Sequence, residues 1–312
     1  MTGIRRRHIA VLQLFPQKLN TVKFNILLLG LFLLSGCSTL QKLVRPTQYH
    51  TLDKPKLDGE LQSKLEIIID DLGLTQAVRD KRLSFAFADI SDINHPIMAG
   101  VNETHMMYAA SLPKIAILFG LFKKIEDGEI EWTDDIKKKA EDMNRASSNP
   151  AASELFKLVG SDYIRELMLS EKYGLYDVER YGGLWAGKEY SKAPAKNTDP
   201  IAGMFHTATP FSVLRFYYML ESVQLLSEKW TLVMRDVMSE TAYKSKFVRG
   251  LQNCCPEAKT LRKAGAWKNF SCDSALVFNR KKKYILVGFA DDPDGEIWLE
   301  KLPVYLNNIA KG

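Results

Sequence analysis

The order of strand and helix signals constrains the fold more than any other feature of this sequence. Residues 84–90 alternate like a half-buried strand, and residues 96–101 fit a second short strand. Strand signals return only near the end of the chain, at residues 260–266, 275–279 and 284–290. Between these two groups the apolar side chains recur at helical spacing. The chain therefore reads as two strands, a long helical block and three more strands.

Helices are expected at both ends of this arrangement and throughout the block. The expected helices span residues 59–80, 112–126, 133–143, 150–158, 161–170, 210–223, 227–239 and 296–309. The simplest α/β (α+β) solution pairs all five strands in one antiparallel sheet covered by the terminal helices. We predict one domain over residues 58–310, with a sheet lobe (58–105 and 255–310) and an inserted all-helical lobe (106–254).

The N-terminal segment has the features of an export signal. Basic residues without any acid precede the apolar run 24–34, which is too short to span a bilayer comfortably but suits a signal-peptide core. The run ends in Leu34-Ser35-Gly36-Cys37, which resembles a bacterial lipobox. We expect a signal peptide (1–36), a lipid on Cys37 and a tether (37–57). The alternative is a short membrane anchor in which Cys37 is incidental.

Ser38 after the lipidated cysteine favours the outer membrane over inner-membrane retention. The net charge of +6 includes five basic residues of the leader, so only +1 remains on the mature chain. This balance indicates no nucleic-acid partner. We expect a monomer held at the membrane through Cys37.

The remaining cysteines are Cys254, Cys255 and Cys272. In an oxidising compartment, Cys272 could pair with either of the adjacent two. The five histidines are scattered and no cysteine has metal-ligand spacing. We therefore expect no metal and no cofactor.

The stretch 108–122 carries a pattern that indicates chemistry. It is apolar on every face except for Lys114, and a helix of that kind is buried. Ser111 lies three residues before Lys114, so the two side chains share a face of the first turn. Burial lowers the pKa of a lysine below its usual value of about 10.4. A lysine with a pKa of roughly 7–8 can take the proton of a serine hydroxyl at neutral pH. The alternative is that Ser111 only caps the helix while Lys114 extends along a lobe boundary.

Three ordered motifs resemble those of the class A β-lactamase and D-alanyl-D-alanine peptidase superfamily, over roughly residues 58–310. They are Ala110-Ser111-Leu112-Pro113-Lys114, Ser147-Ser148-Asn149 and Lys263-Ala264-Gly265. The resemblance implies the fold described above, a nucleophile at Ser111 and a base at Lys114.

The same resemblance gives the other residues their expected roles. Ser147 would relay a proton to the leaving nitrogen, and Asn149 would bind the substrate or steady Lys114. Lys263 would attract the substrate carboxylate, beside Gly265. The N–H groups of Ser111 and Ala266 would hold the oxyanion. Asn149 has a simpler alternative as a helix cap, and Lys263 as a basic residue on a sheet edge.

Two departures from the family pattern limit this expectation. Ala264 stands where the family has a hydroxyl residue, which should weaken carboxylate binding. Gly182 stands where class A enzymes carry the glutamate that drives deacylation, and neither Glu179 nor Glu189 has the right spacing. Trp185 would then lie near the cleft, or simply pack a tight turn.

These observations leave three functional hypotheses. The first is a serine hydrolase that forms an acyl-Ser111 intermediate on a β-lactam or a peptidoglycan D-Ala-D-Ala-type amide, with poor β-lactam turnover. The second is a penicillin-binding protein that is acylated and releases the acyl group slowly. The third is a non-catalytic lipoprotein that binds peptidoglycan or a partner in the cell envelope.

Overall fold

The computed structural model describes residue 52 and residues 54–192, 194 and 197–311. The predicted signal peptide (1–36), Cys37 and most of the tether lie outside the described residues. Within the described ranges, no helix combines the length and the apolarity needed to cross a bilayer.

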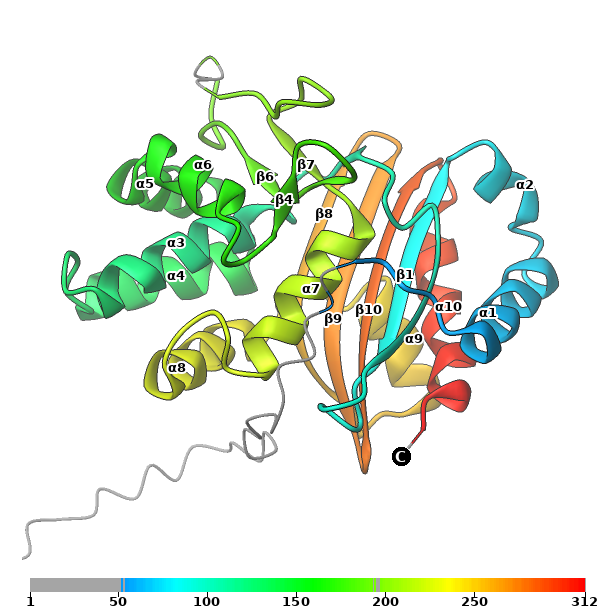
Figure 1. The fold of residues 1–312 in the computed structure, drawn as a ribbon. Helices are drawn as coiled ribbons and strands as arrows, with labels where there is room; N and C mark the ends of the chain where they lie inside the picture. Colours follow the sequence, from blue (N-terminus) through cyan, green and yellow to red (C-terminus); the bar gives the residue numbers. More distant parts are fainter. Residues whose placement is uncertain (1–51, 53, 193, 195–196, 312) are drawn as a thin grey trace, which may run out of the picture. The chain divides into compact units, whose positions relative to one another are not determined.

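The strands of both chain ends form one antiparallel sheet, as predicted. In the described part of the chain this sheet has five strands in the order β2-β1-β10-β9-β8. Figure 1 shows these strands side by side. They are β1 (Leu83–Asp89), β2 (Ile97–Val101), β8 (Lys259–Trp267), β9 (Phe270–Asn279) and β10 (Lys282–Asp291). Strands β10, β9 and β8 therefore continue the sheet from β1 toward the helical lobe, and β8 is an edge strand.

Each face of the sheet is covered by helices, which is why β1 is buried along its whole length. Phe85 and Phe87 point into the core shared with α1 (Gly59–Asp71), α9 (Phe247–Cys254) and α10 (Gly295–Ile309). Ala86 and Ala88 point to the other face, into the core shared with α7 (Pro210–Glu221) and the helical lobe. The alternation of large and small side chains follows the two-residue period of a strand.

The helical lobe surrounds α3, whose residues 114–122 are all buried. Gly120 allows close packing because a Cβ there would lie 2.9 Å from Val159 Cγ1. The helices around it are α4 (Asp134–Arg145), α5 (Asn149–Val159), α6 (Ser161–Leu169) and α8 (Glu228–Ser239), while α3 spans Lys114–Glu126. The lobe also holds the short strands β3 (Met107–Tyr108), β4 (Tyr176–Asp177), β5 (Gly182–Gly183), β6 (Trp185–Ala186) and β7 (His206–Ala208).

The helices differ from the sequence expectation in three ways. The first expected helix is divided into α1 and α2 (Thr75–Arg79), because Gly73 adopts a left-handed φ of +68° just after α1. Helix α9 was not predicted; it packs against α10 on the sheet, although it lies within the range assigned to the helical lobe. Helix α7 (Pro210–Glu221) likewise packs against β10 and β1.

The cysteine pairing expected from the sequence is wrong. Cys254 is bonded to its neighbour Cys255, and Cys272 is free and buried. Cys272 lies in the core on the helical-lobe face of the sheet, whereas Cys255 lies in the core on the opposite face. The sheet therefore separates the two positions that the sequence left open to pairing.

Candidate active site

Ser111 lies on a tight turn between β3 and α3. The turn is anchored to β7 by the Ala109 N–H, which donates to the His206 carbonyl over 2.9 Å. Ala110 adopts a left-handed φ of +46°, an uncommon conformation for a residue with a Cβ. Two cavities, of about 340 and 480 Å³, are both lined by Ser111 and Ala266. The hydroxyl is thus placed where ligands can approach from two sides.

Lys114 is the first residue of α3 and its side chain is 1% exposed. Its Nζ donates to the Ser147 carbonyl over 2.6 Å and to Asn149 Oδ1 over 2.8 Å. Burial, together with the charge of Lys263, lowers the pKa of Lys114 to about 6. A neutral amine has two N–H groups, which these two acceptors occupy, so its lone pair is left for a proton. Lys114 does not extend to solvent, and its arrangement suits a base.

Ser147 and Asn149 come from the connection between α4 and α5. Ser147 has a left-handed φ of +55°, and Ser148 caps α5 by accepting from the Ala151 N–H over 3.3 Å. The cap is therefore Ser148, and Asn149 is the first residue of the helix. The helix-cap explanation for Asn149 is wrong, and its amide oxygen binds Lys114 instead.

Lys263 reaches the same serine from β8. Its Nζ donates to Ser147 Oγ over 2.9 Å and to the Ala264 carbonyl over 3.0 Å, and it is 3% exposed. Burial lowers the pKa of Lys263 to about 7. The Ser147 hydroxyl also lies 3.4 Å from Lys114 Nζ. One hydroxyl therefore contacts both buried amines, which is the arrangement a proton relay requires.

Strand β8 presents its backbone to the turn that carries Ser111. A Cβ on Gly265 would lie 2.7 Å from both the Ala109 carbonyl oxygen and the Ser111 nitrogen, so only glycine fits. Asn144 Nδ2, from α4, donates to the Arg262 carbonyl over 3.2 Å on this edge of the strand. In a strand the backbone groups of every second residue face the same edge, so those of Arg262, Ala264 and Ala266 face this one. The Ala266 N–H therefore faces the site.

The sequence-predicted residues Ser111, Lys114, Ser147, Asn149, Lys263, Gly265 and Ala266 thus form one cluster. No group of three or more histidine, cysteine or acidic side chains among the described residues is arranged to hold a metal. The family model of the "Beta-lactamase enzyme family" matches residues 64–148 and 135–304. The chain belongs to the beta-lactamase enzyme family. It is a member of the β-lactamase-like serine hydrolase superfamily.

Solved structures with the same fold include β-lactamases and a penicillin-binding protein, PBP-A. A PBP-A mutant in an acyl-enzyme complex with penicillin-G is 16% identical, with a TM-score of 0.61, over 81% of this chain and 97% of its own. A β-lactamase from Sphaerobacter thermophilus is 14% identical, with a TM-score of 0.62, over 80% and 97%. One from Chitinophaga pinensis is 12% identical, with a TM-score of 0.58, over 77% and 99%. No curated protein sequence matches the chain.

The segment from Gly182 to Trp185, which contains β5 and the start of β6, departs from the sequence expectation. A side chain at Gly182 would meet Met106, and the residue does not line either cavity next to Ser111. Trp185 is 2% exposed; it packs edge-on against Tyr176 and donates to the Asn197 carbonyl over 3.1 Å. The predicted placement of Trp185 near the cleft is therefore wrong. The alternative, in which Trp185 packs the turn, is confirmed.

Tyr190 is the site residue that sequence reasoning missed in this beta-lactamase family member. Its ring centroid lies 4.4 Å from Lys114 Nζ, and its hydroxyl donates to the Ala110 carbonyl over 3.2 Å. The ring stacks on His206 at 4.1 Å with an interplanar angle of 5°. Burial, with the charges of Lys188 and Lys114, lowers the pKa of His206 to about 3, so its imidazole is neutral. No local sequence signal marks Tyr190, because its partners come from α3 and β7.

The two glutamates considered from the sequence lie in different surroundings, and each carboxylate is placed by other groups than Ser111. Glu189 lines the smaller cavity, but its carboxylate pairs with Lys157 Nζ at 3.2 Å and accepts from Ser191 Oγ over 3.3 Å. Glu179 lines a different cavity, beside Tyr176. The group of the loop after β6 that contacts Lys114 is therefore the Tyr190 ring, and not a glutamate carboxylate.

Proposed function

We propose that this protein is a serine hydrolase that forms an acyl-Ser111 intermediate on a β-lactam or a peptidoglycan D-Ala-D-Ala-type amide. The observation that carries the proposal is the chain of contacts Lys114–Ser147–Lys263, in which the pKa of Lys114, three residues after Ser111, is lowered to about 6. A buried lysine that is neutral near neutral pH can take the proton of a nearby serine hydroxyl, which is the use that such a pKa serves at an active site.

The proposed acylation proceeds in two steps. Lys114 Nζ takes the hydroxyl proton as Ser111 Oγ attacks the substrate carbonyl, whose oxyanion accepts from the Ser111 and Ala266 N–H groups. The C–N bond then breaks, and the proton passes from Lys114 through the Ser147 hydroxyl to the leaving nitrogen. The product is an ester of Ser111, with Lys114 again neutral.

Slow deacylation follows from what surrounds the proposed ester. Hydrolysis needs a water molecule held by a base. Glu189 is engaged by Lys157 and Ser191, and the Tyr190 ring lies over Lys114. These contacts support poor β-lactam turnover, close to the behaviour of an acylation-only penicillin-binding protein. The acyl-enzyme complex of a PBP-A mutant with penicillin-G is a precedent for the adduct in this fold.

The proposed cellular setting is the periplasmic face of the outer membrane, where the monomer is anchored by a lipid on Cys37. The lipobox-like quartet before Cys37 supports this. Cells fed a radiolabelled fatty acid should label the wild-type protein and not Cys37→Ser. Equal labelling of both proteins would contradict the anchor.

The test of the activity is covalent labelling of residues 38–312 by a fluorescent penicillin. We expect mass spectrometry to find an adduct on Ser111 of the wild-type protein and none on Ser111→Ala. The variant removes only the hydroxyl oxygen of the side chain. The decay of the label then measures deacylation. If neither a penicillin nor an activated ester labels the wild-type protein, the hydrolase proposal is wrong, and the non-catalytic binding lipoprotein takes its place.

A further inference from the structure

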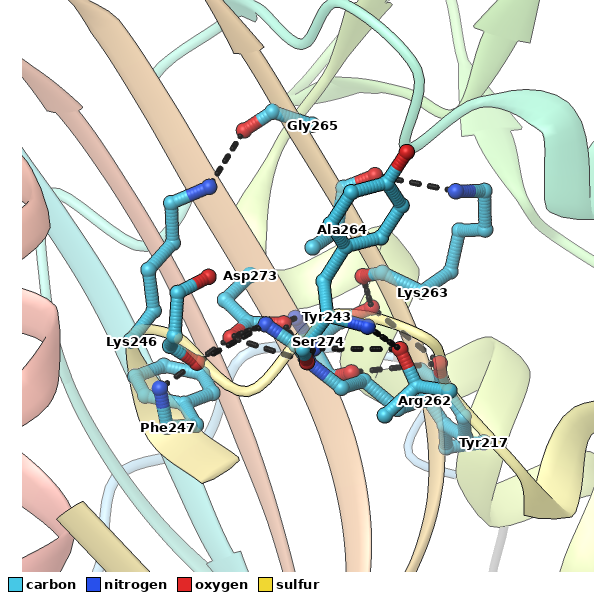
Figure 2. A network of polar contacts seen from close by, with 12 residues as sticks. Tyr217, Tyr243, Lys246, Phe247, Arg262, Lys263, Ala264, Gly265, Asp273 and Ser274 are labelled. Carbon is cyan, nitrogen blue, oxygen red and sulfur yellow. Dashed lines mark hydrogen bonds and ion pairs between the residues drawn. The ribbon is translucent and has the colours of Figure 1, made fainter. Parts of the chain in front are cut away.

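Lys246 is a buried cation that the proposed acylation does not use. It lies directly before α9, it is 4% exposed and it lines the larger cavity with Lys263 and Ser147. Its Nζ donates to the Gly265 carbonyl oxygen over 2.9 Å, as Figure 2 shows. Within the described residues, Lys246 forms no ion pair with a carboxylate. A buried ammonium without a counter-ion is costly, so its position calls for a reason.

The segment around Lys246 is held in place from both sides. Lys246 itself has a left-handed φ of +52°. On one side, Arg262 Nη2 donates to the Ser245 carbonyl over 3.0 Å. On the other side, the Phe247 N–H donates to Asp273 Oδ2 over 3.1 Å, and Asp273 also pairs with Arg262 at 2.7 Å. Such bracing maintains a strained backbone conformation, which concentrates at functional sites.

The peptide that Lys246 contacts is the one that carries the second proposed oxyanion donor. The Gly265 carbonyl and the Ala266 N–H belong to the same planar trans peptide, so they point in opposite directions. The Ala266 N–H faces the Ser111 turn, and Lys246 binds the opposite end. Hydrogen bonds in series strengthen one another, and a charged donor at the carbonyl increases the polarity of the N–H.

We propose that Lys246 is a positioning residue of the oxyanion site, which fixes and polarises the Gly265–Ala266 peptide so that the Ala266 N–H stabilises the oxyanion. The inference rests on the proposed acylation of Ser111. Arg262 cannot take this part, because its guanidinium is engaged by Asp273, the Tyr243 carbonyl and the Ser245 carbonyl. Lys246 acts on the reaction only through the peptide.

The experiment compares Lys246→Met with Lys244→Met, which removes the same charge from an exposed position two residues away. Losing a whole oxyanion donor costs about 10²–10³ in rate, and weakening one should cost about tenfold. We expect the acylation rate constant of Lys246→Met to fall about tenfold at saturating penicillin, with the rate for Lys244→Met unchanged. Infrared difference spectra should place the acyl-ester C=O stretch of Lys246→Met at higher frequency, because its hydrogen bonds are weaker.

The outcomes separate the two proposals. Absence of any wild-type adduct would contradict the acylation of Ser111 itself. An adduct that forms in Lys246→Met at the wild-type rate, with an unshifted C=O stretch, would overturn only the role of Lys246. Lys246→Gln keeps a neutral donor and should give an intermediate stretch if it reaches the carbonyl. If neither variant shows the wild-type thermal unfolding transition, Lys246 serves folding and the inference fails.

Discussion

At the scale of single residues, the environment of each side chain gives it its chemistry. Lys114 and Lys263 are both lysines on regular elements, yet burial lowers the pKa of Lys114 to about 6 and of Lys263 to about 7. Both amines contact the Ser147 hydroxyl. Protonation of one amine makes protonation of the other less favourable, because two like charges would then lie close together. The pair can therefore hold one base and one cation at neutral pH.

The pH dependence of acylation should follow these two amines. Lys114 is a base only when neutral, so the acylation rate should rise with pH up to about 6 and fall roughly tenfold per pH unit below it. Above about pH 7, Lys263 loses its charge and the apparent Kd for a carboxylated penicillin should increase. Stopped-flow measurements at saturating penicillin give the acylation rate constant at each pH, and those at limiting penicillin add the apparent Kd. An acylation rate independent of pH between 4 and 6 would exclude Lys114 as the base.

Ala264 lines the cavity next to Lys263 and offers a second test at a single residue. Ala264→Thr should lower the Kd for a penicillin carboxylate about tenfold or more, because a hydrogen bond to a charged group contributes about 1.5–3 kcal/mol. Ala264→Val has the same shape without the hydroxyl and is the matched control. If Val and Thr change the Kd equally, the hydroxyl makes no bond to the carboxylate.

At the scale of elements, the site exists because three separate segments meet. The turn before α3 brings Ser111 and Lys114, the α4–α5 connection brings Ser147 and Asn149, and the edge strand β8 brings Lys263 and the Ala266 N–H. The loop after β6 adds the Tyr190 ring, which is held by its stacking on His206 of β7. This loop determines which groups reach the proposed ester.

Tyr190→Ala should accelerate the decay of the acyl-enzyme. Removing the ring that covers Lys114 admits water beside the ester, and we expect a decay about tenfold faster, which is less than the roughly 10²–10⁴-fold that a fully positioned base contributes. Tyr190→Phe keeps the ring and should decay like the wild type. The measurement is loss of fluorescent label after a chase with unlabelled penicillin. Equal decay of the two variants would show that the ring does not limit hydrolysis.

At the scale of the whole molecule, a buried ion cluster joins the helical block to the sheet. Glu221, at the end of α7, pairs with Arg235 of α8 at 3.0 Å and with Lys283 of β10 at 2.7 Å. Glu221 and Arg235 are fully buried. Two cations therefore share one carboxylate at the junction of three elements.

Glu221→Gln should destabilise the fold, because it removes the buried carboxylate with which both Arg235 and Lys283 pair. Loss of one partner of such a cluster costs about 3–5 kcal/mol. Urea unfolding followed by circular dichroism measures this free energy. Glu66→Gln, at an exposed position of α1, is the control and should change the free energy of unfolding by less than about 0.5 kcal/mol. Similar midpoints for both variants would contradict the role of the cluster.

The sequence by itself determined the order of the elements, the five-stranded sheet and the motif residues that meet at Ser111. These depend on local periodicity and on short spacings, such as the one-turn separation of Ser111 and Lys114, which the chain carries wherever it folds. The cap of α5 was not among these, because the sequence pattern favoured Asn149 and the structure has Ser148.

Only the tertiary structure decided the contacts between segments far apart in the chain. The separation of Cys272 from Cys255 by the sheet, the Tyr190 ring over Lys114, and the reach of Lys246 to the Gly265 carbonyl have no counterpart in local pattern. Each depends on which face of a strand or helix meets another, and a side chain's partners, burial and pKa follow from that packing.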